Sequence, residues 1–444
     1  MKWWSEIMSE AAKSQNDRAW EALFHKYNVL DRIEAEGAFQ ISAAQIKEFR
    51  EPRLMAKFDH HINLPQIFAR NGLAILPVSR GDYVISHFKA YQPFESLDQT
   101  VTRASLPNLQ SLDPGHIPSE AIAINCALAS GMLADFTGEE RLYPSVSGRM
   151  GSGRFDFHIL NTKTMGNASI CVNNSQIEID AAFEGSGSLS LLEAKRDLSE
   201  DFLIRQLYYP FRVWNNRIAK RVRPIFLVYT NGIFSLYEYA FPQPGFYNSL
   251  VLVKHKNYSI EDTNIRVSDL WETALQAASS ICREPEIPFP QADSFRRVIN
   301  LCELLASREL SREQVTEEYA FNIRQTNYYT DAARYLGLVE KHYEEGRKPV
   351  YGLSAFGRRV MALSYKQRQL ALCGCILRHA VFQEAFQFSV AHGNVLPPRD
   401  VIVEMMRRSR LYKVESASTF IRRSSTVSGW LGWMLALAAG THPS

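Results

Sequence analysis

Two acidic residues and one lysine have the spacing that metal-dependent hydrolysis of a phosphodiester would need. Asp180 ends one strand-like stretch and, after twelve intervening residues, Glu193-Ala194-Lys195 ends another. Side chains two positions apart share one face of a strand, so Glu193 and Lys195 point the same way. The Gly-rich segment 184–188 predicts a turn that brings Asp180 back against them. Carboxylates are ligands for Mg²⁺, and a lysine can position water and offset developing negative charge.

The bare pattern of an acid two residues before a lysine is weak evidence, because chance predicts about 1.6 such pairs in this chain. Glu193-Ala194-Lys195 is nevertheless the only instance in the sequence. It lies on an apolar strand that follows an Asp-bearing strand and precedes a helical stretch. A solvated strand end with a weak ion pair is the structural alternative.

Length and composition indicate several folded domains in a cytoplasmic protein. The 444 residues are 46% hydrophobic, and this length is typical of two to four domains. Six unevenly spaced cysteines do not suggest a disulfide framework. Residues 1–6 lack the features of a signal peptide, and the longest apolar stretch, 430–439, is too short to span a membrane.

The order of the expected elements predicts a mixed α/β fold. Helical periodicity dominates residues 1–50. Two-residue alternation then predicts strands between 155 and 193, followed by a helix over 199–220 and strands over 224–229 and 234–239. Strands, a helix and more strands form an α/β layer pattern. The Pro-rich segment 283–290 is the best linker, and the chain after it is again helical.

Asp180 together with Glu193-Ala194-Lys195 resembles the signature of PD-(D/E)xK nucleases, and the flanking stretches 147–150 and 201–210 resemble type II restriction endonucleases. The resemblance covers roughly residues 120–260 and departs in having Ile179 where the signature has proline. It implies that Asp180 and Glu193 bind Mg²⁺, for which Mn²⁺ can substitute, with the Ala194 carbonyl as a further ligand. It also implies that Lys195 is catalytic and that Gln206 supports the site from the following helix.

The resemblance implies an α/β (mixed) chain with a central PD-(D/E)xK restriction-endonuclease-like core. We expect a mixed, mostly helical N-terminal domain over 1–110 that grips or recognises DNA, and the nuclease domain over 111–285. Two helices and a charged hairpin predict a winged-helix-like domain over 290–362. A similar cadence predicts a second helical or winged-helix-like basic domain over 363–444.

Three groups of residues are candidates for DNA contact. Arginines near the core could bind phosphates, although each could equally form an ordinary ion pair. The start of the expected recognition helix is rich in groups that bond base edges. The alternative interpretation is that this helix belongs to a packing module and that its tyrosines face a core. Two arginines beside hydroxyls in the last domain suit phosphate contacts, with a solvated helix as the alternative. The candidates are Arg149, Arg154 and Arg205; Arg324, Gln325, Thr326, Asn327 and Tyr328; and Arg422 and Arg423.

The charge distribution agrees with a polyanionic partner. The formal net charge is +3, whereas residues 361–444 alone hold ten Lys and Arg against four acids. Together with this charge distribution, the resemblance to PD-(D/E)xK nucleases implies an Mg²⁺-dependent, sequence-specific endonuclease of double-stranded DNA, a type II restriction enzyme that leaves 5′-phosphate ends. A homodimer, a cognate DNA methyltransferase in the same cell and no membrane partner are expected. The alternatives are a repair or junction nuclease with the same core, a non-catalytic DNA-binding regulator with a relic core, and a scaffold that does not bind nucleic acid.

Overall fold

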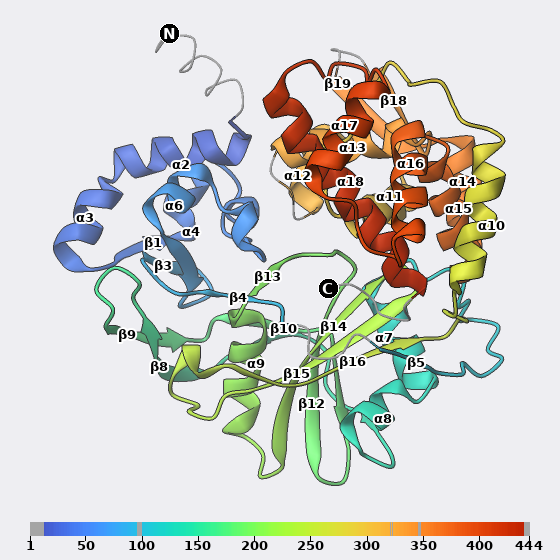
Figure 1. The fold of residues 1–444 in the computed structure, drawn as a ribbon. Coiled ribbons are helices and arrows are strands. Elements are labelled where there is room, and N and C mark those ends of the chain that lie inside the picture. Colours follow the sequence, from blue (N-terminus) through green and yellow to red (C-terminus); the bar gives the residue numbers. More distant parts are fainter. Residues whose placement is uncertain (1–12, 96–99, 320, 322, 345–347, 439–444) are drawn as a thin grey trace.

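The chain forms three units around four hydrophobic clusters, and the predicted mixed α/β class is confirmed. The computed structural model describes residues 13–95, 100–319, 321, 323–344 and 348–438. The residues tested for a signal peptide (1–6) and the tip of the expected charged hairpin (345–347) lie outside this range. Figure 1 shows the N-terminal unit (blue) and the C-terminal unit (yellow to red) side by side at one end of the central sheet.

The N-terminal unit packs short helices around a small antiparallel sheet with strand order β1-β3-β2. Trp20, Phe24 and Phe68 meet edge to face in its core. This core ends at Ile85, so the unit is shorter than the predicted 1–110. Its elements are α2 (Gln15–Lys26), α3 (Val29–Glu36), β1 (Phe39–Ser42), α4 (Ala43–Lys47), α5 (Pro52–Met55), η1 (His61–Asn63), α6 (Gln66–Asn71), β2 (Ala74–Pro77) and β3 (Asp82–Ser86).

The central unit is built on a seven-stranded mixed sheet with strand order β5-β16-β15-β14-β12-β11-β6. Its strands are β5 (Val101–Arg103), β6 (Tyr143–Pro144), β11 (Ala181–Glu184), β12 (Ser188–Lys195), β14 (Arg221–Thr230), β15 (Ile233–Ala240) and β16 (Val251–Ser259). β12 runs antiparallel to β11 and parallel to β14. Alternating residues of β12 enter two cores: Leu191 packs with α9 (Arg205–Asn215), and Leu192 packs with α7 (Glu120–Ala129) and α8 (Met132–Thr137).

Shorter strands connect this sheet to the rest of the central unit. They are β4 (Tyr91–Pro93), β7 (Gly148–Gly151), β8 (Arg154–Leu160), β9 (Asn167–Asn173), β10 (Gln176–Ile179) and β13 (Asp201–Leu203), with the short helix η2 (Tyr247–Ser249) before β16. The single helix predicted over 199–220 is wrong at both ends. Residues 201–203 pair with β4 as a strand, and α9 ends at Asn215.

The C-terminal unit is one body with one hydrophobic core, which extends from Ile265 and also includes Ile233 of the central sheet. The domains predicted over 290–362 and 363–444 share this core. It also takes in α10 (Val267–Ala278), which the prediction placed in the central domain, and Phe289 of the expected linker. The remaining elements are α11 (Phe295–Ser307), β17 (Leu310–Ser311), α12 (Arg312–Glu318), α13 (Ile323–Tyr335), β18 (Val339–Glu344), β19 (Lys348–Leu353), α14 (Ala355–Met361), α15 (Tyr365–Leu377), α16 (Ala380–Ala391), α17 (Arg399–Arg408) and α18 (Ala417–Ala438).

The expected pair of helices followed by a hairpin is present as α12, α13, β18 and β19, with β17 as a third strand against β19. The expected second module is only half confirmed. Residues 363–438 form helices and, within the described residues, contain no strand. A wing is therefore absent from that segment, and Trp430 of α18 is instead fully buried in the shared core. No helix in the described ranges has both the length and the apolar character needed to cross a membrane.

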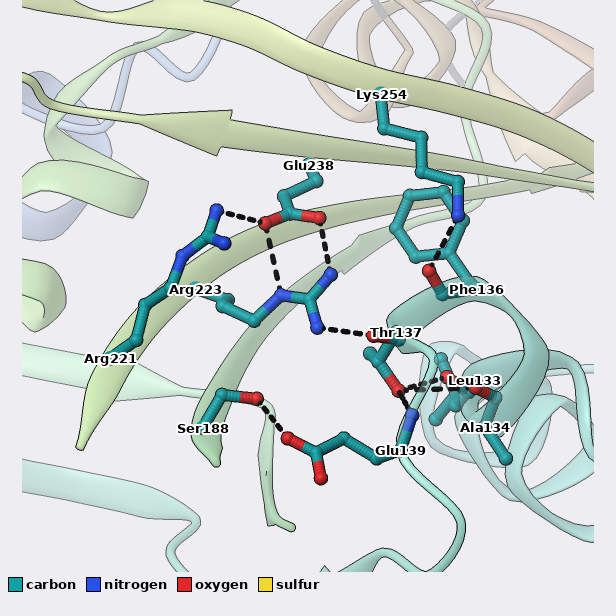
Figure 2. A network of polar contacts seen from close by, with 10 residues as sticks. All are labelled: Leu133, Ala134, Phe136, Thr137, Glu139, Ser188, Arg221, Arg223, Glu238 and Lys254. Carbon is teal, nitrogen blue, oxygen red and sulfur yellow. Dashed lines mark hydrogen bonds and ion pairs between the residues drawn. The ribbon is translucent and has the colours of Figure 1, made fainter. Parts of the chain in front are cut away.

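A buried ion-pair network fixes the end of the sheet at which β12 begins (Figure 2). Glu238 of β15 is 2% exposed and accepts two hydrogen bonds from Arg223, at 2.9 and 2.5 Å, and a third from Arg221. Arg223 also donates to the carbonyl oxygen of Thr137 at the end of α8, at 2.6 Å. A cation at the carboxyl end of a helix satisfies its free carbonyl groups and stabilises its dipole. The network therefore ties α8 to the sheet.

The turn before β12 lies against the carboxylate of Glu139. Glu139 accepts hydrogen bonds from the hydroxyl groups of Ser186 and Ser188, at 3.0 and 2.7 Å. A Cβ atom at Gly185 would lie 2.4 Å from the Glu139 carboxyl carbon. The hairpin that brings Asp180 towards Glu193 therefore closes over the Glu139 carboxylate.

We expect Glu238→Ala to lower the free energy of unfolding by roughly 3–5 kcal/mol, because it leaves the Arg223 guanidinium buried without its carboxylate. Urea denaturation measures the change. Glu178→Ala removes the exposed Glu178–Arg149 pair and serves as the control, with little expected effect. If the two variants were equally stable, the network would not anchor the sheet.

Candidate active site

The predicted hairpin brings Asp180 to the strand that ends in Glu193 and Lys195. Asp180 lies between β10 and β11, and β11 pairs with β12 in a register that sets Ala181 against Leu192. Its carboxylate Oδ2 accepts a hydrogen bond of 2.8 Å from the backbone N–H of Ala194. The three positions selected from sequence therefore meet at the carboxyl end of β12.

Glu193 is a buried carboxylate held by two side-chain donors. Its side chain is 11% exposed, and its Oε1 accepts 2.6 Å from Lys195 Nζ and 2.7 Å from Gln206 Nε2. Burial raises the pKa of Glu193 to about 7; the nearby Asp180 raises it too, whereas Lys195 lowers it. Gln206 in α9 thus supports Glu193 from behind the strand, which is the position expected from sequence.

Lys195 is buried among acidic groups and remains charged. Burial alone would lower its pKa, but the charges of Glu193, Asp59 and Glu120 outweigh burial, and the pKa is raised. Asp59 comes from the N-terminal unit, and Glu120 opens α7 behind the cap residue Ser119. Burial raises the pKa of Glu120, and the charges of Asp180 and Asp197 raise it further. Neither Asp59 nor Glu120 was a candidate in the sequence, because each is distant along the chain and lies in no motif.

The segment directly after Lys195, residues 196–201, contacts both flanking units. From the N-terminal unit, His60 Nε2 lies 3.0 Å from the Asp197 carboxylate, and the N–H of His61 donates to Asp201 Oδ1 at 2.9 Å. Burial lowers the pKa of His60, but the hydrogen bond and charge of Asp197, together with Asp201 and Asp59, outweigh burial and the pKa is raised. From the C-terminal unit, Asn300 of α11 bonds the backbone at Arg196 and Leu198.

The donor chemistry of the site fits Mg²⁺. Asp180 and Glu193 supply two carboxylates, and the charge of Asp180 contributes to the raised pKa of Glu193, a repulsion that a divalent cation would relieve. Within the described residues, no three His, Cys, Asp or Glu side chains form a group that could hold a metal ion. Mg²⁺ often takes only one or two protein carboxylates and fills its other positions with water and phosphate oxygens. The Ala194 carbonyl remains the expected third protein ligand.

A cavity of about 10 Å³ adjoins Glu193 and Gln206. That volume is about enough for one water molecule. Gln206 Oε1 is buried and, among the described residues, has no hydrogen-bond partner.

The three arginines predicted to contact phosphates near the core differ in exposure and in the partners they already have. Arg149 on β7 is exposed and forms a 3.2 Å ion pair with Glu178, and Arg154 opens β8 with its side chain exposed. Arg205 begins α9 beside Gln206 and lies over the ring of Tyr209 at 5.8 Å. Arg205 is thus the closest of the three in sequence to a site residue, and the other two lie on the flanking strands.

The predicted recognition helix is α13, and the predicted DNA contacts in its first turns differ in how exposed they are. Arg324 is exposed, and Gln325, Asn327 and Tyr328 are partly exposed. Thr326 is fully buried and its hydroxyl lies 2.8 Å from that of Thr316. We therefore remove Thr326 from the candidate DNA contacts, because its side chain faces the core of the unit.

The two arginines predicted as DNA contacts on α18 also differ in exposure. Arg422 is exposed, whereas Arg423 is partly buried and donates a hydrogen bond to the carbonyl oxygen of Phe289. Arg423 thus ties α18 to the segment that enters the C-terminal unit. Arg422 is the better candidate for a phosphate contact.

Three family models match parts of the chain, and each is described only as a domain of unknown function. Residues 17–85 match the Domain of unknown function (DUF6996), residues 86–259 match the Domain of unknown function (DUF6997), and residues 297–439 match the Domain of unknown function (DUF7226). These ranges follow the three structural units. No curated protein and no solved structure matches the chain.

We expect Mg²⁺ to bind the metal-free protein more weakly as the pH falls. Ligation needs an ionised Glu193, and its pKa of about 7 leaves this residue mostly protonated at pH 6. The apparent affinity should therefore be about tenfold lower at pH 6 than at pH 8. Isothermal titration calorimetry with MgCl₂ measures it. Glu193→Gln should remove binding, and the control Glu184→Gln, at the opposite end of β11, should retain both affinity and pH dependence. A magnesium affinity that stays the same from pH 6 to pH 8 would contradict the prediction.

Proposed function

We propose that the chain is an Mg²⁺-dependent endonuclease of double-stranded DNA, of the type II restriction class. The observation that carries the proposal is the convergence of Asp180, Glu193 and Lys195 at the end of β12, with Gln206 hydrogen-bonded to Glu193. Two carboxylates beside a buried lysine suit hydrolysis of a phosphodiester. A surface ion pair would not need a buried acid with a supporting glutamine.

Each residue has a distinct part in the proposed reaction. Asp180, Glu193 and the Ala194 carbonyl would hold Mg²⁺, which supplies charge neutralisation and an activated water when bound. Lys195 keeps its positive charge at neutral pH because its pKa is raised. Its ammonium group can donate to the attacked phosphate or orient water as negative charge develops. Gln206 holds Glu193 in place from α9.

The C-terminal unit supports DNA as the substrate. The order α11, β17, α12, α13, β18, β19 follows the winged-helix plan, with α13 as the helix that would enter the major groove. The exposed Arg324 near its start and the exposed Arg422 on α18 would contact phosphates or bases. The balance of ten basic against four acidic residues in 361–444 would add a sequence-independent attraction.

Plasmid DNA, unmethylated and methylated, incubated with Mg²⁺ tests the proposed activity. We expect discrete fragments from at least one substrate, and none when EDTA is present. Lys195→Ala should reduce the cleavage rate by about 10²–10³-fold, because one preorganised donor to the developing charge is lost. Lys220→Ala, at the opposite end of the sheet, is the matched control and should cleave normally. Wild-type protein that binds DNA without cutting either substrate would favour the non-catalytic regulator.

We expect Arg324→Ala to weaken DNA binding while leaving the fold intact, because Arg324 is exposed at the start of α13. If it contacts a phosphate, the slope of log affinity against log salt should fall by about one. Fluorescence anisotropy with EDTA present measures binding without cleavage. Arg217→Ala removes an exposed arginine near the start of β14, far from the candidate site, and should not change the slope. Equal effects of the two substitutions would place α13 away from DNA.

A further inference from the structure

The backbone that follows Lys195 is held in place by one buried side chain of the C-terminal unit. Asn300 of α11 is 2% exposed. Its Nδ2 donates to the carbonyl oxygen of Arg196 at 2.9 Å, and its Oδ1 accepts from the N–H of Leu198 at 2.8 Å. The two hydrogen bonds hold the backbone on both sides of Asp197. Because Arg196 directly follows Lys195, they also limit where the end of β12 can lie.

The same face of α11 also forms hydrogen bonds with the end of β14, the strand next to β12. Arg297, Asn300 and Glu303 are spaced three residues apart, so they follow one face of the helix. Glu303 accepts hydrogen bonds from the Thr230 hydroxyl at 2.9 Å and from the N–H of Asn231 at 2.7 Å, where β14 turns into β15. Asn300 also donates to Glu303 at 3.1 Å. One helix thus holds the carboxyl ends of both β12 and its parallel neighbour β14.

Arg297 connects these contacts of α11 to α13. It is 5% exposed, and its guanidinium group lies 4.5 Å from the ring centroid of Phe321 and 5.5 Å from that of Tyr329 in α13. It also lies 3.6 Å from the Glu200 carboxylate in the segment after Lys195. A continuous set of contacts therefore runs from α13 through α11 to residues 196–200.

We propose that Asn300 is a positioning residue for Lys195, through which the C-terminal unit controls cleavage separately from DNA binding. The proposal deepens the proposed nuclease function and rests on it. Without the Asn300 amide, the Arg196 carbonyl and the Leu198 N–H lose their side-chain partner in a partly buried segment, and the segment shifts to recover hydrogen bonds. A displacement of about 1 Å at a reacting group can cost roughly 10²-fold in rate. DNA affinity, which depends on the outer surface of the unit, stays unchanged.

The test separates the chemical step from DNA binding in three variants. Asn300→Ala removes the amide, Asn300→Leu removes its hydrogen bonds at similar volume, and Cys302→Ala truncates a fully buried side chain of the same helix that faces the hydrophobic core. Single-turnover cleavage of pre-bound plasmid, started with Mg²⁺, gives the rate of the chemical step. Anisotropy with EDTA gives the dissociation constant for DNA, and thermal denaturation reports stability.

We expect both Asn300 variants to cleave about 10²-fold more slowly, with dissociation constants within about twofold of the wild-type value. Cys302→Ala, even if equally destabilised, should cleave at the wild-type rate. The inference is overturned if the Asn300 variants cleave normally, if their loss lies in DNA affinity, or if Cys302→Ala loses the same activity. Wild-type protein that cuts no DNA would overturn the proposed function and this inference with it; a cutting wild type with unaffected Asn300 variants would overturn the inference alone.

Discussion

The site depends on keeping a carboxylate buried at the end of β12. A buried acid is costly unless its charge is balanced and its oxygen atoms are hydrogen-bonded. Lys195 and Gln206 supply that balance from the same strand and from α9, and the two strand neighbours of Glu193 face the opposite core. The raised pKa of Glu193 shows that the balance is incomplete, since burial and the nearby Asp180 still favour its protonated form. A divalent cation bound there, as proposed above, would relieve that imbalance.

The constraints on this site come from all three units. At the opposite end of the sheet, Glu238 binds both Arg221 and Arg223, and Arg223 also binds the end of α8 (Figure 2). The end with the candidate site has acids from separate parts of the chain, with Lys195 among them and Lys57 ion-paired to Asp59 at 3.6 Å. Its supports, His60 and Asn300, come from the units on either side. The same strands are therefore held by an ion-pair network at one end and by contacts from all three units at the other.

Local patterns in the sequence predicted most strands of the central unit and the Gly-rich turn before β12, because these are local signals. They missed β11: the predicted strand that ends at Asp180 is β10, which pairs with β7, and β11 is the strand that forms the hairpin with β12. The same signals identified Asp180, Glu193 and Lys195, since two of the three share a strand and the third precedes the paired one. Contacts between units could not be read in this way. Asp59, His60, Glu120 and Asn300 reach the site only through tertiary packing, and Thr326 looked like a surface residue because helical spacing does not say which face of α13 is buried. The single core of residues 265–437 was missed because the Pro-rich stretch resembles a linker, although Phe289 within it is buried.

The support from Asn300 also bears on the order of events during synthesis. The N-terminal unit and the strands with Asp180, Glu193 and Lys195 leave the ribosome before α11 exists. Until residue 300 has been made and its helix has docked, the Arg196 carbonyl and the Leu198 N–H have no partner on that side. The geometry around Lys195 is therefore completed late, when the unit that would read DNA is itself being folded. A chain made in this order cannot complete the surroundings of Lys195 before its C-terminal unit has docked.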